Sequence, residues 1–393
     1  MSLLIRDARL GVPSSSATAS GRASLRIQGE RIGAIAPGLA PLPGETVIEA
    51  GGRVVLPGFV DAHTHAAFAG DRLDEFELSL QGKSYLEILA AGGGILSTVR
   101  AVRQATQAEL GRLLRDRLSS MLAHGTTSVE VKSGYGLTTA DELKLLRAIH
   151  DAAQSFPGTV LPTALLGHAL DPDEPRFVER VIDETLPAVH AEFPGIPVDA
   201  FCERGAWSVD DCRRLFERAR TLGHPLRLHA DQFTAAGGLE LALELGALSV
   251  DHLEASDPAA LLRLAQSGTF GVVLPVSSFH TGSPYADART FLDAGGRLVI
   301  ATNFNPGSAP CYAMPFAIAL AARKLRLTPR EAITACTSTA AELLGLPDRG
   351  RLAVGARADL LLLRHNDERS LAHELGGNPI ERVFVAGRLV SVS

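Results

Sequence analysis

The segment VLPGFVDAHTH, residues 55–65, decides which fold and which chemistry can be expected of this chain. Residues 59–65 are predicted to form one short β-strand, because a brief apolar run comes directly after the Pro-Gly turn signal. His63 and His65 stand two residues apart near its end, so their side chains share one face and can bind one ion. A single His-x-His pattern recurs by chance, and its meaning depends on the rest of the chain.

Seven further strand-like runs come after it and alternate with stretches of helical periodicity. The eight predicted strands cover residues 59–65, 127–132, 159–168, 198–203, 226–232, 249–254, 269–275 and 297–304. Eight strand–helix units in succession predict an α/β protein whose main part, residues 58–349, is a (β/α)8 TIM barrel with its active site at the carboxyl ends of the strands. An open doubly wound sheet is the alternative, but no G-x-G-x-x-G follows the first strand and no P-loop is present.

The two ends of the chain differ from this alternating part. Residues 1–57 and 350–393 consist of short apolar runs broken by Gly, Pro and Ser, which is typical of strands and turns. Half a sheet cannot bury its apolar face alone. We therefore expect the two ends to complete one small β-sandwich domain.

Composition excludes several classes of protein. The 393 residues are 46% hydrophobic and carry a net charge of −6, so there is no basic surplus for a nucleic-acid backbone or an anionic membrane. No run approaches the roughly 18 apolar residues of a membrane span. Four scattered cysteines favour a reducing cytoplasm over a disulfide framework. The mean hydropathy of +0.13 is compatible with a homodimer.

Histidines mark the ends of several predicted strands. Five of the 12 lie there: His63, His65, His168, His229 and His252. Because strand ends converge in a barrel, these imidazoles should lie close together. Histidines that only form hydrogen bonds within the core would instead be scattered along the chain. Imidazole suits zinc or iron, and a hydrolytic metal needs about three protein ligands plus an open position. We expect His63, His65 and His229 to bind one Zn²⁺ or Fe³⁺ per chain, with His252 moving the proton in a metal-assisted hydrolysis.

These residues also carry a resemblance to a known family. VLPGFVDAHTH and the closing GRLAVGARADLLLL (350–363) resemble the amidohydrolase superfamily of metal-dependent barrel hydrolases. Within this superfamily, the chain most resembles the imidazolonepropionase family, because it contains the motifs of that family in the same order. These motifs are FAGDR (68–72), EVKSGYGL (130–137), LLGHA (165–169), LHADQF (228–233), VDHLE (250–254) and ATNFNPGS (301–308). The resemblance implies that water opens the ring of a small-molecule substrate, 4-imidazolone-5-propanoate, to give N-formimidoyl-L-glutamate in histidine degradation.

The resemblance also implies a set of substrate-binding residues. They are Arg72, Tyr135, His168 and Gln232, with Asn305, Gly307 and Ser308 forming a turn for the glutamate end of the product. Arg72 offers a planar, bidentate partner for the propanoate carboxylate, although by itself it reads as a solvated loop arginine. A nucleobase deaminase needs no such partner, so Arg72 together with Tyr135 and His168 separates this family from the alternative, a deaminase or another cyclic-amide hydrolase of the superfamily.

Two positions depart from the family pattern. Asn303 stands where the family usually has an Asp that binds the metal and accepts a proton, and Gln232 stands where some members have Glu. An amide oxygen can coordinate a metal but carries no charge. We therefore expect Asn303 to be a weak metal ligand and a weak catalytic partner. Either the chain is a variant of impaired activity, or His252 transfers the proton alone.

A catalytically silent barrel is the remaining alternative, and Asn303 is its main support. Retention of all three expected histidine ligands argues against it. Lys132 invites comparison with the carboxylated lysine of binuclear relatives, but that lysine belongs on the fourth strand, which here ends near Glu203. The sequence therefore predicts one metal ion, with Lys132 and Glu203 as supporting charges.

Overall fold

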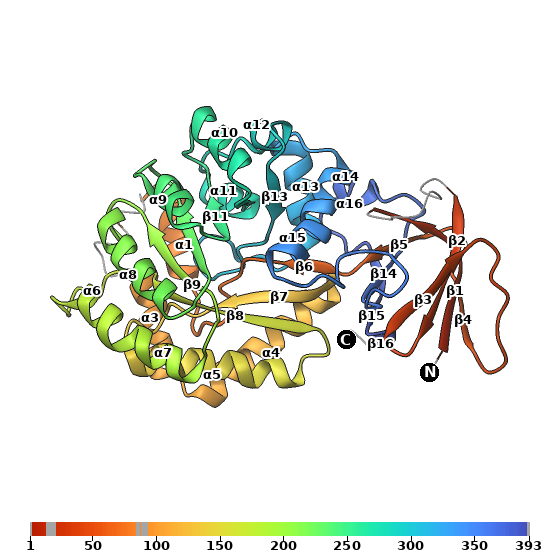
Figure 1. Ribbon diagram of the computed structural model, residues 1–393, viewed down its shortest axis with the longest axis horizontal. Helices are drawn as coiled ribbons and strands as arrows, with labels where there is room; N and C mark the ends of the chain where they lie inside the picture. The colour runs from red at the N-terminus through yellow and green to blue at the C-terminus, as the bar shows by residue number, and fades with distance from the viewer. Residues whose placement is uncertain (1, 13–20, 84–86, 88–92, 391–393) are drawn as a thin grey trace.

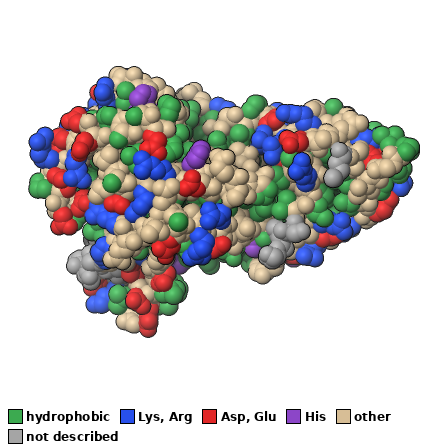
Figure 2. Space-filling model, turned by 90° about the horizontal axis from the view of Figure 1, so that it is seen from below, with side chains coloured by type: hydrophobic (Ala, Val, Ile, Leu, Met, Phe, Trp, Pro, Cys, Tyr) green, Lys and Arg blue, Asp and Glu red, His purple; other side chains and the backbone are tan. Residues whose placement is uncertain are grey.

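The computed structural model describes residues 2–12, 21–83, 87 and 93–390. Figure 1 shows a larger part of strands and helices joined to a smaller part of strands, in which both chain ends lie. No helix among these described residues has the length and apolarity to cross a membrane. On the face in Figure 2, basic and acidic side chains are interspersed.

The larger part is an eight-stranded parallel barrel. Its strands are β6 (Phe59–Asp61), β7 (Thr126–Lys132), β8 (Thr159–Gly167), β9 (Val198–Cys202), β10 (Leu226–Ala230), β11 (Ser249–His252), β12 (Phe270–Val273) and β13 (Arg297–Ile300). Consecutive strands pair in parallel from β6 to β13. All eight predicted strands and the (β/α)8 class are thereby confirmed, although most strands end earlier than predicted.

The barrel closes just beyond the ends of β6 and β13. The backbone N–H of Asn303 donates to the carbonyl of His63 at 3.1 Å, and that of His65 donates to Phe304 at 2.9 Å. His63 and His65 thus lie after the last residue of β6, Asp61, and not inside a strand as the sequence predicted. The backbone around them is still fixed on both sides, because the N–H of Lys132 in β7 donates to Thr64.

Helices surround the barrel (Figure 1). They are α1 (Leu73–Leu80), α3 (Ile95–Gln104), α4 (Gln107–Ala123), α5 (Thr139–Ser155), α6 (Phe177–Arg180), the π-helical η1 (Val181–Thr185), α7 (Leu186–Glu192), α8 (Val209–Thr221), α9 (Gly238–Leu245), α10 (Pro258–Ser267), α11 (Pro275–Thr281), α12 (Ala288–Asp293), α13 (Met314–Lys324), α14 (Pro329–Ala335), α15 (Ser338–Leu343) and α16 (Ser370–His373). Several begin at a side-chain cap: Thr106, Thr138, Ser208 and Asp257 each accept an N–H of the first turn.

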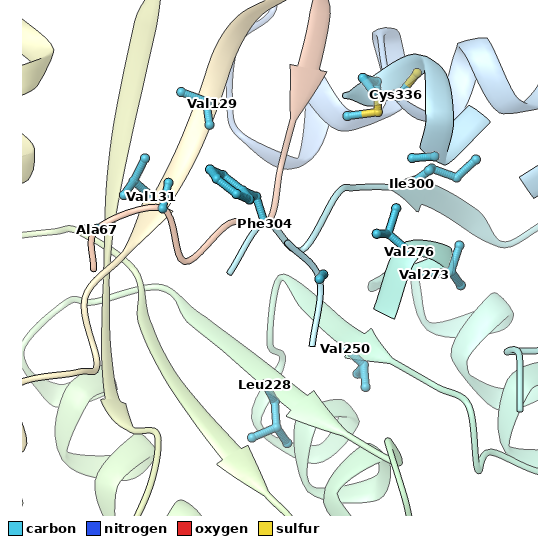
Figure 3. Close-up of a cluster of buried hydrophobic side chains, with 14 of the residues drawn as sticks. Ala67, Val129, Val131, Leu228, Val250, Val273, Val276, Ile300, Phe304 and Cys336 are labelled. Carbon is cyan, nitrogen blue, oxygen red and sulfur yellow. The ribbon is translucent and has the colours of Figure 1, made fainter. Parts of the chain in front are cut away.

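Alternation along the strands separates apolar from polar side chains. Val129 and Val131 of β7, Leu228 of β10 and Val250 of β11 belong to the large hydrophobic cluster, part of which Figure 3 shows. The intervening residues include Glu130 of β7, whose carboxyl group lies 3.4 Å from a guanidinium nitrogen on β10. Because β8 and β9 separate these strands, that contact crosses the barrel interior. This part of the interior is therefore polar.

The smaller part is one mixed sheet built from both ends of the chain. Its strands are β1 (Ser2–Leu10), β2 (Arg22–Gln28), β3 (Arg31–Ala36), β4 (Thr46–Glu49), β5 (Val54–Pro57), β14 (Leu360–Leu363), β15 (Ile380–Val385) and β16 (Arg388–Val390). The order is β16-β15-β14-β5-β1-β2-β3, and β4 pairs with β1. We propose domain boundaries after residue 57 and before residue 350, because β5 ends at Pro57 and β6 begins two residues later.

Strand β14 connects the two hydrophobic cores. Leu361 and Leu363 pack into the cluster that includes the barrel, whereas Leu360 and Leu362 pack into the cluster of the smaller sheet. All four side chains are completely buried. The run of four leucines therefore fits a strand with a core on each face.

Leu361→Ala should destabilise the protein by about 2–5 kcal/mol, because the truncation leaves a cavity in a closed core. The free energy of unfolding in urea measures the loss. Leu389→Ala is the matched control, since Leu389 of β16 is 55% exposed. Equal stability changes in the two variants would contradict the packing of β14.

Candidate metal centre and active site

Three histidines converge at the carboxyl end of the barrel. His63 and His65 follow β6, His229 lies in β10, and all three are buried. The Nε2 atom of His65 lies 3.3 Å from Nε2 of His63 and 3.3 Å from Nε2 of His229. Among the described residues, this is the one group whose histidine, cysteine or carboxylate atoms come close enough to hold a metal ion. The structure thus brings together the three histidines that the sequence singled out.

Carboxyl groups orient two of these rings. Nδ1–H of His63 donates to Asp251 at 2.6 Å, and Nδ1–H of His229 donates to Asp199 at 3.1 Å. With their Nδ1 atoms donating, both rings leave Nε2 without a proton. His63 and His229 are therefore held in the tautomer that a metal ligand requires.

The three imidazoles are neutral in their buried positions. Burial, followed by the charge of Lys132, holds the pKa of His63 well below its usual value. Burial and the neighbouring His168 do the same to the pKa of His65, and burial lowers the pKa of His229. Neutral imidazole is the ligand form for zinc and iron.

The arrangement fits a metal ion. Nε2 of His65 has at most one proton to donate, so at least one of its two 3.3 Å contacts holds two nitrogens together without a hydrogen bond, which a cation would stabilise. Nitrogens about 2.0–2.1 Å from a tetrahedral zinc lie roughly 3.3 Å apart, which matches these distances. The side-chain oxygen of Asn303 is also buried and has no hydrogen-bond partner. Asn303 has a φ of 55°, a left-handed conformation that Asn and Asp tolerate best.

Buried cations hold the orienting carboxyl groups in turn. Nζ of Lys132 lies 2.7 Å from Asp199 and 2.8 Å from Glu130, and Nη2 of Arg227 lies 2.8 Å from Asp251. Although burial opposes ionisation, His229 and Lys132 keep the pKa of Asp199 well below its usual value. Lys132 is therefore a supporting charge, as the sequence predicted.

His252 stands beside these three histidines, at the end of β11. Its ring centroid lies 5.6 Å from that of His229 and 6.1 Å from that of His63. Its Nδ1 atom lies 3.2 Å from a carboxyl oxygen of Glu254, and the same carboxyl group also accepts from Ser278. The Glu254 carboxyl group thus fixes one ring nitrogen and leaves Nε2 available for proton transfer.

Tyr135 and His168 form an adjacent wall. The ring of His168 stacks on His65 at 5.0 Å and lies 5.0 Å from Tyr135. Nδ1–H of His168 donates to the carbonyl of Gly134, and burial lowers the pKa of His168 to about 3. The buried carboxyl group of Glu142 accepts the N–H groups of Gly134, Gly136 and Leu137 and so fixes the turn that carries Tyr135.

Arg72 lies next to the turn that follows β13. A Cβ atom added to Gly307 would lie 3.2 Å from Nη1 of Arg72. The guanidinium also pairs with Glu75, while its Nε atom is buried without a hydrogen-bond partner. Arg72 is therefore not the solvated loop arginine that the sequence left open.

The turn at residues 305–308 is held from within. Oδ1 of Asn305 accepts the N–H groups of Gly307 at 2.8 Å and Ser308 at 2.7 Å, and Nδ2 donates to the carbonyl of Asn303. These groups already have partners inside the turn. Asn305 thus shapes the turn, and its contact with the product stays a prediction.

Comparisons with known proteins agree with this geometry. The amidohydrolase family model, described as "Amidohydrolase family", matches residues 78–391. An imidazolonepropionase of Herpetosiphon aurantiacus is 49% identical, covering 88% of this chain and 84% of the relative, and one of Deinococcus radiodurans is 47% identical, covering 93% and 91%. The chain belongs to the imidazolonepropionase family. It is a hydrolase that acts on a carbon–nitrogen bond of a cyclic amide.

Solved structures show the same fold at low sequence identity. A triazine hydrolase variant superposes with a TM-score of 0.78 at 19% identity, covering 99% of this chain and 94% of that one. The atrazine chlorohydrolase TrzN of Arthrobacter aurescens, complexed with zinc, gives 0.74 at 18% identity, covering 98% and 94%. These similarities confirm the fold.

Gln232, a predicted substrate ligand for this imidazolonepropionase family member, lies half-buried in the bend after β10. The next two residues are anchored, since the N–H groups of Phe233 and Thr234 both donate to the Glu203 carboxyl group. Glu203 therefore fixes the bend and is a supporting charge, as predicted. The contact of Gln232 with substrate stays a prediction.

Several supporting residues were missed by sequence reasoning. They are Asp199, Asp251, Arg227, Glu254 and Glu142. Asp199 and Asp251 carried a usable signal, because each is a charged residue inside an otherwise apolar strand. Glu254 lies two residues after His252. Glu142 lies on α5 and carried no comparable signal.

Asp251→Asn should weaken metal binding by roughly 10- to 100-fold, because Nδ1 of His63 loses its carboxyl partner. Competition between metal-free protein and a coloured chelator measures the affinity. Asp116→Asn is the control, since the Asp116 side chain is 66% exposed. Unchanged affinity in a folded Asp251→Asn protein would show that this contact does not support the metal.

Proposed function

We propose that this protein hydrolyses 4-imidazolone-5-propanoate to N-formimidoyl-L-glutamate in histidine degradation. The observation that carries the proposal is the convergence of three oriented, neutral imidazoles beside His168 and Tyr135. The curated relatives, named imidazolonepropionases at 42–49% identity, support the same substrate.

One metal ion completes this proposed site. His63, His65 and His229 would hold it, with Asn303 as a weak fourth ligand, and Zn²⁺ and Fe³⁺ both suit this donor set. Such an ion supplies Lewis acidity, which polarises the ring carbonyl and lowers the pKa of water. The neutral amide of Asn303 adds no negative charge to the site.

His252 is the proposed proton carrier. Its Nδ1 atom is held by Glu254, so Nε2 can take a proton from the attacking water and return it to the ring nitrogen that leaves. Water attacks the ring carbonyl, the bond between that carbon and the ring nitrogen breaks, and the new carboxylate remains on the glutamate part of the product. Asn303 assists by orientation alone.

The remaining residues hold the substrate. Arg72 pairs with the propanoate carboxylate, and Tyr135, His168 and Gln232 bind the ring and its substituents. The turn that carries Gly307 and Ser308 borders the same region, because Gly307 lies against Arg72. Fixing the tail in this way orients the carbonyl for attack.

We also propose a cytoplasmic location. All four cysteines are free thiols, which fits a reducing compartment. The expected homodimer stays a prediction.

The proposed function is tested by turnover of 4-imidazolone-5-propanoate, followed by its ultraviolet absorbance, on protein of measured metal content. We expect activity with one ion per chain, and a higher metal affinity in Asn303→Asp because a charged ligand replaces a neutral one. Activity in the Asp variant alone would identify Asn303 as a disabling residue. Inactivity of both metal-loaded proteins would contradict the substrate assignment.

A further inference from the structure

His280 in α11 makes two contacts that tie separate elements together. Its ring stacks on Phe76 of α1, with centroids 5.4 Å apart and an interplanar angle of 20°. Burial lowers the pKa of the same ring, and a hydrogen bond with the backbone of Gly307 opposes this shift. His280 therefore joins α1 to the turn after β13.

Within the part of the chain that the structure describes, helix α1 has few other attachments. None of its residues is buried, and Leu73 and Leu80 are 69% and 71% exposed. Its described polar link to the barrel is Glu75, which pairs with Arg72 and accepts the N–H of Gly94 at 3.1 Å. A helix that buries no apolar side chain depends on such individual contacts for its position.

Arg72 lies where these contacts meet. It immediately precedes α1, and its Nη1 atom faces Gly307, where an added Cβ would lie only 3.2 Å away. His280 is therefore connected to Arg72 in two ways. It contacts the backbone of Gly307, which lies against Arg72, and it stacks on Phe76 of α1, the helix that Arg72 precedes. A shift of either element would move the guanidinium relative to the metal ligands.

We propose that His280 is a positioning residue that, together with Phe76, fixes the guanidinium of Arg72 for the carboxylate of the substrate. The inference rests on the proposed function and adds a role in specificity. Arg72, held by His280 and Phe76, forms a clamp that selects substrates with an anionic tail. His280 itself does not touch the reacting atoms in this account.

A double-mutant cycle tests the proposal on the full-length, metal-loaded protein. His280→Ala should raise KM for 4-imidazolone-5-propanoate by roughly three- to tenfold, as expected for the loss of one hydrogen bond and a stacking contact, with little change in kcat. Phe76→Ala should act in the same direction, and Phe76→Tyr should restore the KM because it keeps the ring. In an Arg72→Ala background, His280→Ala should have no further effect.

Two controls separate positioning from a general structural role. Phe279→Ala removes the neighbouring ring, which is 55% exposed and packs on Phe316 at 5.6 Å, and it should leave KM unchanged. The propanamide analogue, which lacks the carboxylate, should give the same kcat/KM with wild type and His280→Ala. Binding of imidazole-4-propanoate to metal-free protein, measured by calorimetry, should weaken in His280→Ala by the same factor as KM rises.

Unchanged KM in His280→Ala, an equal loss with the propanamide analogue, or additive effects with Arg72→Ala would each overturn the proposal. Failure of the wild-type protein to turn over the propanoate substrate would instead contradict the proposed function. Calorimetry with metal-free protein still reports on the clamp in that case.

Discussion

The structure depends on a set of charges buried inside the barrel. Lys132 and Arg227 lie among the carboxyl groups of Glu130, Asp199 and Asp251, and all five side chains are at most 2% exposed. Burial of charge is tolerated only where partners compensate it. Here two of the carboxyl groups also hold histidines, so the same contacts that satisfy the interior aim the imidazoles of the site.

This arrangement links stability to metal binding. The network contains one more formal negative than positive charge, and it ends at three neutral imidazoles whose Nε2 atoms converge. A metal cation at that point would balance the interior as well as serve the reaction. Asn303 adds no negative charge, so the carboxyl groups of the network alone would balance the charge of the metal cation.

Strand β14, packed between two cores, ties the barrel to the sheet that both chain ends build.

The other side of the site is built from loops that individual contacts hold in place. Glu142 fixes the turn of Tyr135, Glu203 fixes the bend after Gln232, and Asn305 fixes the turn of Gly307. Each of these residues binds backbone N–H groups, so the residues that we propose to bind the substrate rest on defined backbone positions. In this proposal, metal chemistry and substrate recognition come from different parts of the barrel end.

The fold and the metal ligands could be predicted because their signals are local and repeated. Eight strand–helix alternations are visible in the sequence, and His63, His65 and His229 stand at strand ends. The pairing of these histidines could not be predicted. Asp199 and Asp251 stand out as charged residues within their strands, but which histidine each one holds is visible only once β9 to β11 lie side by side. His280 is a similar case, because its contacts join α11, α1 and the turn after β13, which are far apart in the chain.

Anomalous diffraction from crystals of the metal-loaded protein, recorded on both sides of the zinc and iron absorption edges, tests whether the three histidines bind one metal ion. We expect a single peak per chain, about 2.0–2.2 Å from the Nε2 atoms of His63, His65 and His229. Two peaks bridged through Lys132, or a peak away from the three histidines, would contradict it.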